Sequence, residues 1–117
     1  MSEIQTMNIG LADNLRRGID SRKSRLLVII PTYNEIENIQ RLIHHIKCDV
    51  SVPLEILVVD DNSPDGTAEK VAEIQKSTPN LHLLKRSGKM GLGSAYLSGF
   101  RVAFDSGFEY VLTMDSD

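Results

Sequence analysis

The sequence has one cysteine, Cys48, no tryptophan, and few aromatic residues, which make up 5% of the chain. A single cysteine excludes any disulfide within the chain and fits a reducing compartment. No apolar run approaches the roughly 20 residues that a membrane-spanning helix needs, and the N-terminus lacks the apolar core of a signal peptide. From these absences we expect the chain itself to be soluble and cytoplasmic.

An excess of positive charge is also absent. The 117 residues include 13 Lys and Arg against 16 Asp and Glu, which gives a net charge of −3. This balance argues against the broad basic surface that nucleic-acid binding requires, so we expect no nucleic-acid partner. The remaining composition, 41% hydrophobic and 25% charged, is that of one ordinary globular domain with a modest core.

Residues 1–24 form a polar N-terminal extension. Four apolar residues in it fall at helical spacing: Ile4, Met7, Leu11 and Leu15. Basic residues follow them, and a basic amphipathic helix can rest on an anionic membrane surface. The alternative is a poorly ordered leader, which is the usual behaviour of terminal segments and the one we expect here.

Strands and helices alternate through residues 25–117. Four apolar segments are typical of buried strands: Leu26–Ile30, Leu54–Val59, Leu81–Leu84 and Glu109–Met114. Pro31 is expected to end the first of them. The third predicted helix, residues 91–106, has a face of small residues: Ala95, Gly99, Val102 and Ala103. This alternation predicts an α/β fold, a Rossmann-like parallel sheet with helices on both faces.

The starts of the other two helices are predicted from capping patterns. An apolar stripe marks the first helix: Ile36, Ile39, Ile43 and Ile46. Asn34 and Glu37 form a capping-box pattern at its start. Ser63 and Pro64 predict the N-cap and first residue of the second helix, which is expected to end near Lys76.

Polar residues gather where three of the predicted strands end. Pro31–Glu35 follow the first strand, Asp60–Asn62 the second, and Asp115–Asp117 the fourth. In doubly wound sheets ligands bind beyond the carboxyl ends of the strands, at the topological switch point. Three such clusters on one edge therefore predict a binding site there.

Each cluster has a functional and a structural interpretation. Tyr33 can stack on a nucleobase, and Glu35 and Asp61 can accept hydrogen bonds from a base or ribose. Alternatively, Tyr33 covers the sheet edge, Glu35 serves the first turn of its helix, and Asp60 caps a turn. An Asp-x-Asp pair at a strand end can hold Mg²⁺ or Mn²⁺ against a diphosphate.

The glycine-rich loop of residues 86–93 precedes the third predicted helix, whose N-terminus suits an anion. The loop is neither a Walker loop nor a dinucleotide fingerprint. Two interpretations of Arg86 and Lys89 stay open, as phosphate ligands or as solvated loop charges.

Four segments, in this order, are similar to motifs of the family 2 glycosyltransferases of GT-A fold: Val28–Glu35, Ile56–Thr67, Gly91–Tyr96 and Met114–Asp117. Within that family the sequence most resembles the dolichol-phosphate, or polyprenyl-phosphate, mannosyltransferases. The resemblance covers residues 26–117, so residues 25–117 are identified as the nucleotide-diphosphate-sugar-binding portion of such a domain.

The resemblance implies transfer of mannose from GDP-mannose to polyprenyl phosphate with inversion. It implies that Asp115, Ser116 and Asp117 hold Mg²⁺ or Mn²⁺ and the donor diphosphate, with Asp115 and Asp117 as the metal ligands and catalytic residues. It also implies a nucleoside pocket lined by five residues: Pro31, Tyr33, Glu35, Val59 and Asp61.

The family pattern continues past Asp117, with further strands, acceptor-side helices and a membrane-anchoring segment. We therefore expect a fragment, truncated after the fourth strand, that binds donor without transferring sugar. The full-length protein is expected at the cytoplasmic face of a membrane, which it contacts through the missing regions. The fragment is expected to self-associate through an exposed apolar sheet face.

Other functions stay open. They are a polyprenyl-phosphate glucosyltransferase that uses UDP-glucose, a nucleotide-binding module without transferase activity, and a receiver-like signalling domain. Ser116 stands where the family frequently has Ala, a change we expect to be tolerated. The motifs do not determine the base and sugar of the donor or the length of the acceptor.

Overall fold

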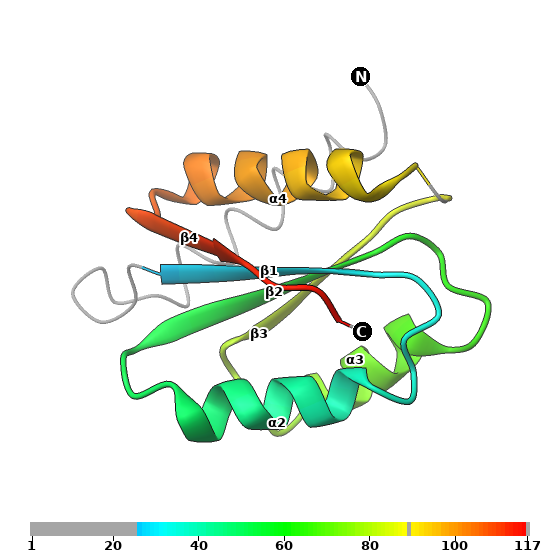
Figure 1. Ribbon diagram of the computed structural model, residues 1–117, viewed down its shortest axis with the longest axis horizontal. Coiled ribbons are helices and arrows are strands. Elements are labelled where there is room, and N and C mark those ends of the chain that lie inside the picture. Colours follow the sequence, from blue (N-terminus) through cyan, green and yellow to red (C-terminus); the bar gives the residue numbers. More distant parts are fainter. Residues whose placement is uncertain (1–25, 89, 117) are drawn as a thin grey trace.

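Four parallel strands form one sheet in the order β3-β2-β1-β4 (Figure 1). The computed structural model describes residues 26–88 and 90–116, so the predicted extension at residues 1–24 lies outside the described residues. The strands are β1 (Leu26–Thr32), β2 (Leu54–Asp60), β3 (Leu81–Lys85) and β4 (Tyr110–Thr113). All four predicted strands are confirmed, and they pair in parallel.

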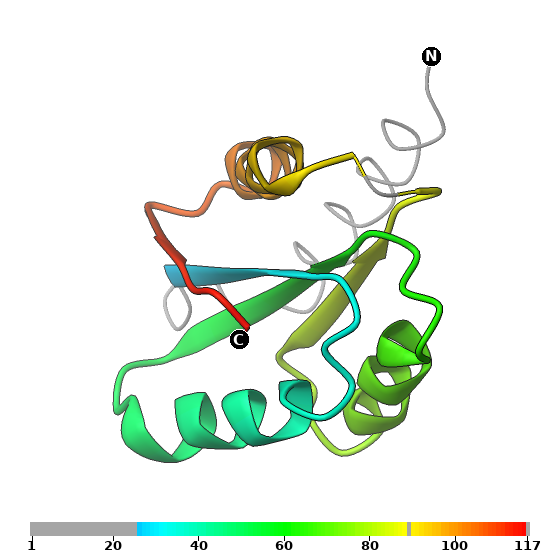
Figure 2. The same cartoon turned by 45° about the vertical axis from the view of Figure 1, so that its right-hand side comes forward.

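Three helices cover the two faces of the sheet. They are α2 (Ile39–Asp49), α3 (Thr67–Gln75) and α4 (Leu92–Ser106). Figures 1 and 2 show α2 and α3 on one face and α4 on the other. Alternate residues of β1 supply the two halves of the core, with Val28 and Ile30 packed toward α2 and α3, and Leu27 and Ile29 packed toward α4. The predicted α/β architecture is confirmed.

The small-residue face of α4 allows this helix to lie close against β1. Its four predicted members are all buried. A Cβ placed on Gly99 would lie 2.6 Å from Cγ2 of Ile29, a distance that real Cβ atoms essentially never show. Gly99 is therefore required by the close approach of α4 to the middle of the sheet.

Strand β1 continues through Pro31 to Thr32, so the prediction that Pro31 ends the strand is wrong. Pro31 pairs with Val59 of β2, whereas the β4 register ends at Ile29. At Pro31 the strand has a neighbour on one side only, and a missing backbone N–H is tolerated there.

The first predicted helix starts later than its capping pattern indicates. Helix α2 begins at Ile39, and Asn34 is not its N-cap. Asn34 has a left-handed φ of 57° and donates its backbone N–H to Ser63 Oγ, whereas an N-cap residue needs an extended backbone. The capping box with Glu37 is therefore wrong, and Ile36 lies in the preceding turn, where it is 37% exposed.

The second predicted helix also starts later, after Gly66 rather than at Ser63 and Pro64. The hydroxyl of Ser63 is engaged by Asp60, to which it donates over 2.6 Å. Gly66 has a φ of 92°, a left-handed conformation that a glycine adopts without strain. The six residues between β2 and α3 thus form an ordered loop instead of a first helical turn.

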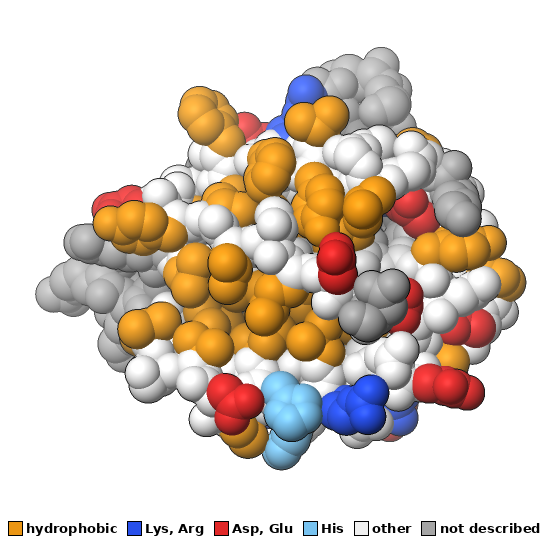
Figure 3. Space-filling view, viewed as in Figure 1, with side chains coloured by type: hydrophobic (Ala, Val, Ile, Leu, Met, Phe, Trp, Pro, Cys, Tyr) orange, Lys and Arg blue, Asp and Glu red, His pale blue; other side chains and the backbone are white. Residues whose placement is uncertain are grey.

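Strand β4 forms one edge of the sheet and is exposed along its length. Tyr110 is 63% exposed, Val111 40% and Leu112 45%. Figure 3 shows that apolar side chains gather over this side of the molecule. Across the described segments, no helix is both long and apolar enough to cross a lipid bilayer.

Candidate functional site

A pocket with a volume of about 280 Å³ opens at the carboxyl ends of the strands. The chain passes from β3 at one edge to β4 at the other by way of α4, so the switch point of the sheet lies between β1 and β4. The pocket is lined by the end of β1, by residues that follow β1, β2 and β4, and by the start of α4: Pro31, Thr32, Tyr33, Glu35, Asp61, Gly91, Leu92, Ala95, Asp115 and Ser116. The three predicted strand-end clusters therefore meet in one pocket, as the topology requires.

The exit of β4 is fixed against the exit of β1. Ser116 is buried and donates its hydroxyl to the backbone carbonyl of Pro31 over 3.1 Å. The next residue toward β4, Asp115, is exposed and faces the pocket. The predicted partner of Asp115 in the Asp-x-Asp pair, Asp117, lies outside the described residues.

Helix α4 contributes a hydroxyl to this exit. Tyr96 donates its phenolic O–H to Oδ1 of Asp115 over 2.9 Å. Partial burial raises the pKa of Tyr96, and the hydrogen bond and negative charge of Asp115 raise it further. The phenol consequently stays protonated and holds one of the two carboxylate oxygens in place.

The loops after β1 and β2 are joined by a ladder of hydrogen bonds. Three consecutive backbone N–H groups of the first loop each donate to a side chain of the second: Asn34 to Ser63 Oγ (2.9 Å), Glu35 to Thr67 Oγ1 (3.0 Å) and Ile36 to Asp65 Oδ2 (3.1 Å). Two of the motifs that carry the family resemblance are thus one structural unit. Its function is to hold the Tyr33–Glu35 segment at the pocket.

Asp65 anchors this ladder. Desolvation acts against ionisation of Asp65, but donation by the Thr67 hydroxyl and by the backbone N–H groups of Ile36 and Thr67 outweighs it, so the pKa of Asp65 lies below its ordinary value. The carboxylate also accepts from Thr67 N over 3.0 Å, two residues along the chain.

Asp60 caps a turn, as the structural interpretation of the strand-end clusters predicts. It is completely buried, and its carboxylate accepts from Thr32 Oγ1 at 2.7 Å and from the backbone N–H and hydroxyl of Ser63 at 3.0 and 2.6 Å. These donors leave Asp60 facing the protein interior, as a cap for the turn that follows β2.

Asp61 lines the pocket, and its carboxylate accepts two hydrogen bonds from Arg86, which is not among the lining residues. Arg86 Nε donates to Oδ1 at 2.5 Å, and Nη2 donates to Oδ2 at 2.9 Å. Arg86 is 1% exposed, so neither sequence-based interpretation of it, as a phosphate ligand or as a solvated charge, is correct. Lys89, the other basic residue in question, lies outside the described residues.

The other predicted nucleoside-pocket residues have different positions. Pro31, Tyr33 and Glu35 line the pocket with Asp61. Val59 is fully buried in the α4 side of the core and is not among the residues that line the pocket.

Sequence reasoning did not predict the contacts that Arg86 makes with Asp61 and Tyr96 makes with Asp115. Arg86 directly follows β3, so the strand-end rule that grouped the acidic clusters places it at the same edge. Tyr96 carried no such signal, because its contact with Asp115 depends on how α4 lies over the sheet.

The donor set suits a metal ion that takes part of its coordination from a ligand. Asp115 offers Oδ2, which contacts no hydrogen-bond donor among the described residues. Within residues 26–88 and 90–116 no three His, Cys, Asp or Glu side chains are grouped to form a complete metal site. Mg²⁺ usually takes one or two carboxylates and completes its shell with water and substrate phosphates.

Comparison with known sequences gives the family. The model of "Glycosyl transferase family 2" matches residues 27–117. The chain is 42% identical over 93 residues to an undecaprenyl-phosphate mannosyltransferase of Micrococcus luteus, and 44% identical over 97 residues to a polyprenol monophosphomannose synthase of Mycolicibacterium smegmatis. It is 43% identical over 94 residues to a dolichol-phosphate mannosyltransferase of Pyrococcus furiosus. Each match covers 80% of this chain, but only 38%, 35% and 26% of the respective relative.

Solved structures show the same fold. The mannosyltransferase PcManGT of Pyrobaculum calidifontis, in complex with GDP-Man and Mn²⁺, matches 84% of this chain and 35% of its own with a TM-score of 0.62 at 24% identity. TarS residues 1–349 of S. aureus match 80% of this chain and 27% of theirs with a TM-score of 0.62 at 31% identity. The strand order, the site at the switch point and the matched motifs agree with these findings, and the chain belongs to glycosyl transferase family 2.

Proposed function

We propose that this chain forms the donor-binding part of a polyprenyl-phosphate mannosyltransferase, and that its pocket binds GDP-mannose. The observation that carries the proposal is the meeting of the β1, β2 and β4 exits in one pocket at the switch point. The three relatives described above, which are mannosyltransferases or a phosphomannose synthase by name, support the choice of sugar.

In this proposal the pocket residues divide between the two ends of the donor. Tyr33 stacks on the base, while Glu35 and Asp61 accept hydrogen bonds from base or ribose donors. Pro31 belongs to the wall of the nucleoside end. Asp115, with Ser116 fixing its backbone and Asp117 beside it in sequence, faces the diphosphate.

The charge of the pocket supports a divalent cation. Its described lining includes three carboxylates, Glu35, Asp61 and Asp115, and no Lys or Arg side chain. A diphosphate placed among these groups is repelled unless a cation accompanies it. Mg²⁺ or Mn²⁺, held by Asp115 and Asp117, would act as a Lewis acid that stabilises the departing diphosphate.

We further propose polyprenyl phosphate as the acceptor of the whole protein, in a reaction that inverts the sugar. A phosphate monoester is already anionic at neutral pH, so the attack on the sugar requires no strong general base. Because the acceptor chain is a lipid, the reaction is expected at a membrane, on its cytoplasmic face.

Calorimetric titration tests the donor assignment. The 117-residue chain is titrated with GDP-mannose and with UDP-glucose, each with and without Mn²⁺, and Asp115→Asn is measured alongside. We expect Mn²⁺-dependent binding of GDP-mannose that Asp115→Asn weakens by about tenfold or more. Tighter binding of UDP-glucose would instead support the glucosyltransferase alternative. Absence of binding to both donors would overturn the proposal.

A further inference from the structure

We propose that Arg86 is a positioning residue that selects the nucleobase by limiting Asp61 to a single open acceptor site. The inference rests on the proposed function, because it concerns the base end of the same donor pocket. Arg86 itself does not line the pocket. It acts through Asp61, whose carboxylate it holds with two hydrogen bonds. The nucleotides it favours are those whose base carries a ring N–H, such as guanine and uracil.

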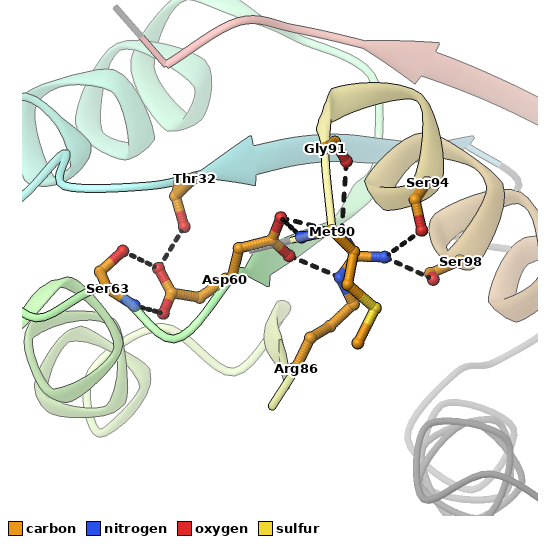
Figure 4. Close-up of polar contacts among 9 residues, drawn as sticks. Thr32, Asp60, Ser63, Arg86, Met90, Gly91, Ser94 and Ser98 are labelled. Carbon is orange, nitrogen blue, oxygen red and sulfur yellow. Dashed lines mark hydrogen bonds and ion pairs between the residues drawn. The ribbon is translucent and has the colours of Figure 1, made fainter. Parts of the chain in front are cut away.

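All five N–H donors of the Arg86 guanidinium are used. Nε and one Nη2 donor bind the Asp61 carboxylate, and the second Nη2 donor binds the backbone carbonyl of Gly91 at 3.3 Å. The two Nη1 donors bind Ser94 Oγ at 2.8 Å and Ser98 Oγ at 3.3 Å (Figure 4). Arginine has no further donor to give a ligand, so its contribution to binding is indirect.

These contacts fix three parts of the pocket wall to one another. Arg86 follows β3, Asp61 follows β2, Gly91 directly precedes α4, and Ser94 and Ser98 lie in the first turns of α4. Asp61 and Gly91 both line the pocket. A buried charge is stable only when it is paired and hydrogen-bonded, and this arrangement meets both conditions. Arg86 therefore sets the position of the Asp61 carboxylate and not merely its charge.

The remaining hydrogen-bonding capacity of Asp61 is small. A carboxylate has about four acceptor sites. Arg86 takes one on each oxygen, and the backbone N–H of Met90 takes a second on Oδ2 at 3.3 Å. No other donor among the described residues contacts Asp61, so within residues 26–88 and 90–116 one acceptor site on Oδ1 is unused.

One fixed acceptor discriminates between bases in a simple way. The ring N1–H of guanine and the ring N3–H of uracil are each a single donor that this site can accept. Adenine has a bare ring nitrogen at the equivalent position, and its lone pair would face the carboxylate. A site with a fixed polar group rejects a ligand that leaves that group unpaired. Release of Asp61 from Arg86 would let the carboxylate rotate and accept other donors, including the amino group of adenine.

The test measures, on the 117-residue chain, the ratio of the dissociation constant for ADP to that for GDP or UDP. Dissociation constants for GDP, UDP and ADP are measured with Mn²⁺ for the unmodified chain, Arg86→Lys and Ser98→Ala. In the unmodified chain we expect GDP or UDP to bind about tenfold or more tightly than ADP, the contribution of one hydrogen bond to a charged group. Arg86→Lys retains the charge but not the paired N–H donors, and is expected to reduce this ratio to about threefold or less.

Ser98→Ala is the matched control. It removes one partner of Arg86 but none of the donors to Asp61, so the ratio is expected to stay unchanged. A purely structural role of Arg86 would weaken all three nucleotides equally, and equal weakening by Arg86→Lys overturns the inference. Absence of nucleotide binding by the unmodified chain would instead overturn the proposed function.

A second test uses nuclear magnetic resonance on the unmodified chain. It therefore does not depend on whether the Arg86→Lys variant folds. With Mg²⁺ in place of Mn²⁺, the ¹⁵N–¹H signal of Arg86 Nε reports directly on Asp61 Oδ1. We expect this signal to shift on addition of GDP or UDP and to stay in place on addition of inorganic diphosphate. A signal that responds equally to diphosphate and to GDP contradicts a role at the base.

Discussion

The hydroxyl of Tyr96 in α4 donates to Oδ1 of Asp115 over 2.9 Å, so a helix residue orients the carboxylate that follows β4. Tyr96 is itself held by Phe100, whose ring stacks on it with centroids 6.4 Å apart and an interplanar angle of 18°. Among the described residues no donor contacts the other carboxylate oxygen of Asp115, Oδ2. Groups that hold a metal-binding carboxylate in this way tune its affinity without touching the metal.

Tyr96→Phe removes the hydroxyl and keeps the ring. We expect it to weaken Mn²⁺ binding in the presence of GDP by about tenfold, the lower end for loss of a partner of a metal ligand, because the contact is exposed. The free energy of unfolding is expected to change by less than about 0.5 kcal/mol. Titration of Mn²⁺ monitored by electron paramagnetic resonance measures the affinity for Mn²⁺, and urea unfolding measures the free energy of unfolding.

Phe100→Leu, which removes only the stacking ring, is the control and is expected to weaken Mn²⁺ binding less than Tyr96→Phe does. Equal loss in both variants would show that ring packing, not the hydroxyl, matters.

Gly99→Ala tests the close contact of α4 with β1. The new Cβ meets Ile29 at 2.6 and 2.8 Å, in the middle of a packed interface. Overpacking of this kind is expected to lower the free energy of unfolding by about 1–3 kcal/mol. Gly93→Ala, at a position in the first turn of the same helix with no atom within 4 Å, is the matched control. It is expected to raise stability by up to about 1 kcal/mol through helix propensity. Urea denaturation measures both, and equal effects of the two substitutions would contradict the packing argument.

The sequence predicted the sheet, the two covered faces and the edge that holds the pocket, because these follow from periodicity and from the strand-end rule. It also identified the small-residue face around Gly99 correctly. Those features depend on residues close together in the chain or on a general property of parallel sheets.

The errors occurred in the loops. Asn34 and Ser63 both have the residue types of helix N-caps, but they bind to each other across 29 positions of sequence. Arg86 likewise has its partner Asp61 in the loop that follows another strand. Such contacts depend on the distance between loops in the folded chain, which local capping patterns do not contain.

Asp65 makes the stability of the chain depend on pH in the acid range. Its pKa is lower in the folded chain than in the unfolded one, so its contribution to stability is present above the unfolded value and is lost as the pH falls through the folded value. We therefore expect stability to decrease as the pH falls below about 4. Asp65→Asn should cost about 1 kcal/mol at pH 7, as for loss of a cap, and should flatten this part of the pH profile. Urea unfolding between pH 3 and pH 7 measures both effects. Parallel profiles for the two proteins would show that Asp65 does not contribute in this way.

The exposed edge of the sheet leads to a prediction about association. The segment Tyr110–Thr113 carries no charge and no proline, the usual features that protect an edge strand from pairing with another chain. We expect the 117-residue chain to self-associate as its concentration rises, with β4 as the contact.

Leu112→Lys places a charge on this edge and is expected to reduce association. Val52→Lys, at a 54% exposed position before β2, is the control with the same change of charge away from the edge. Sedimentation velocity over a range of concentrations measures all three proteins. A single monomer boundary for the unmodified chain throughout, or equal effects of the two lysines, would contradict an interface at β4.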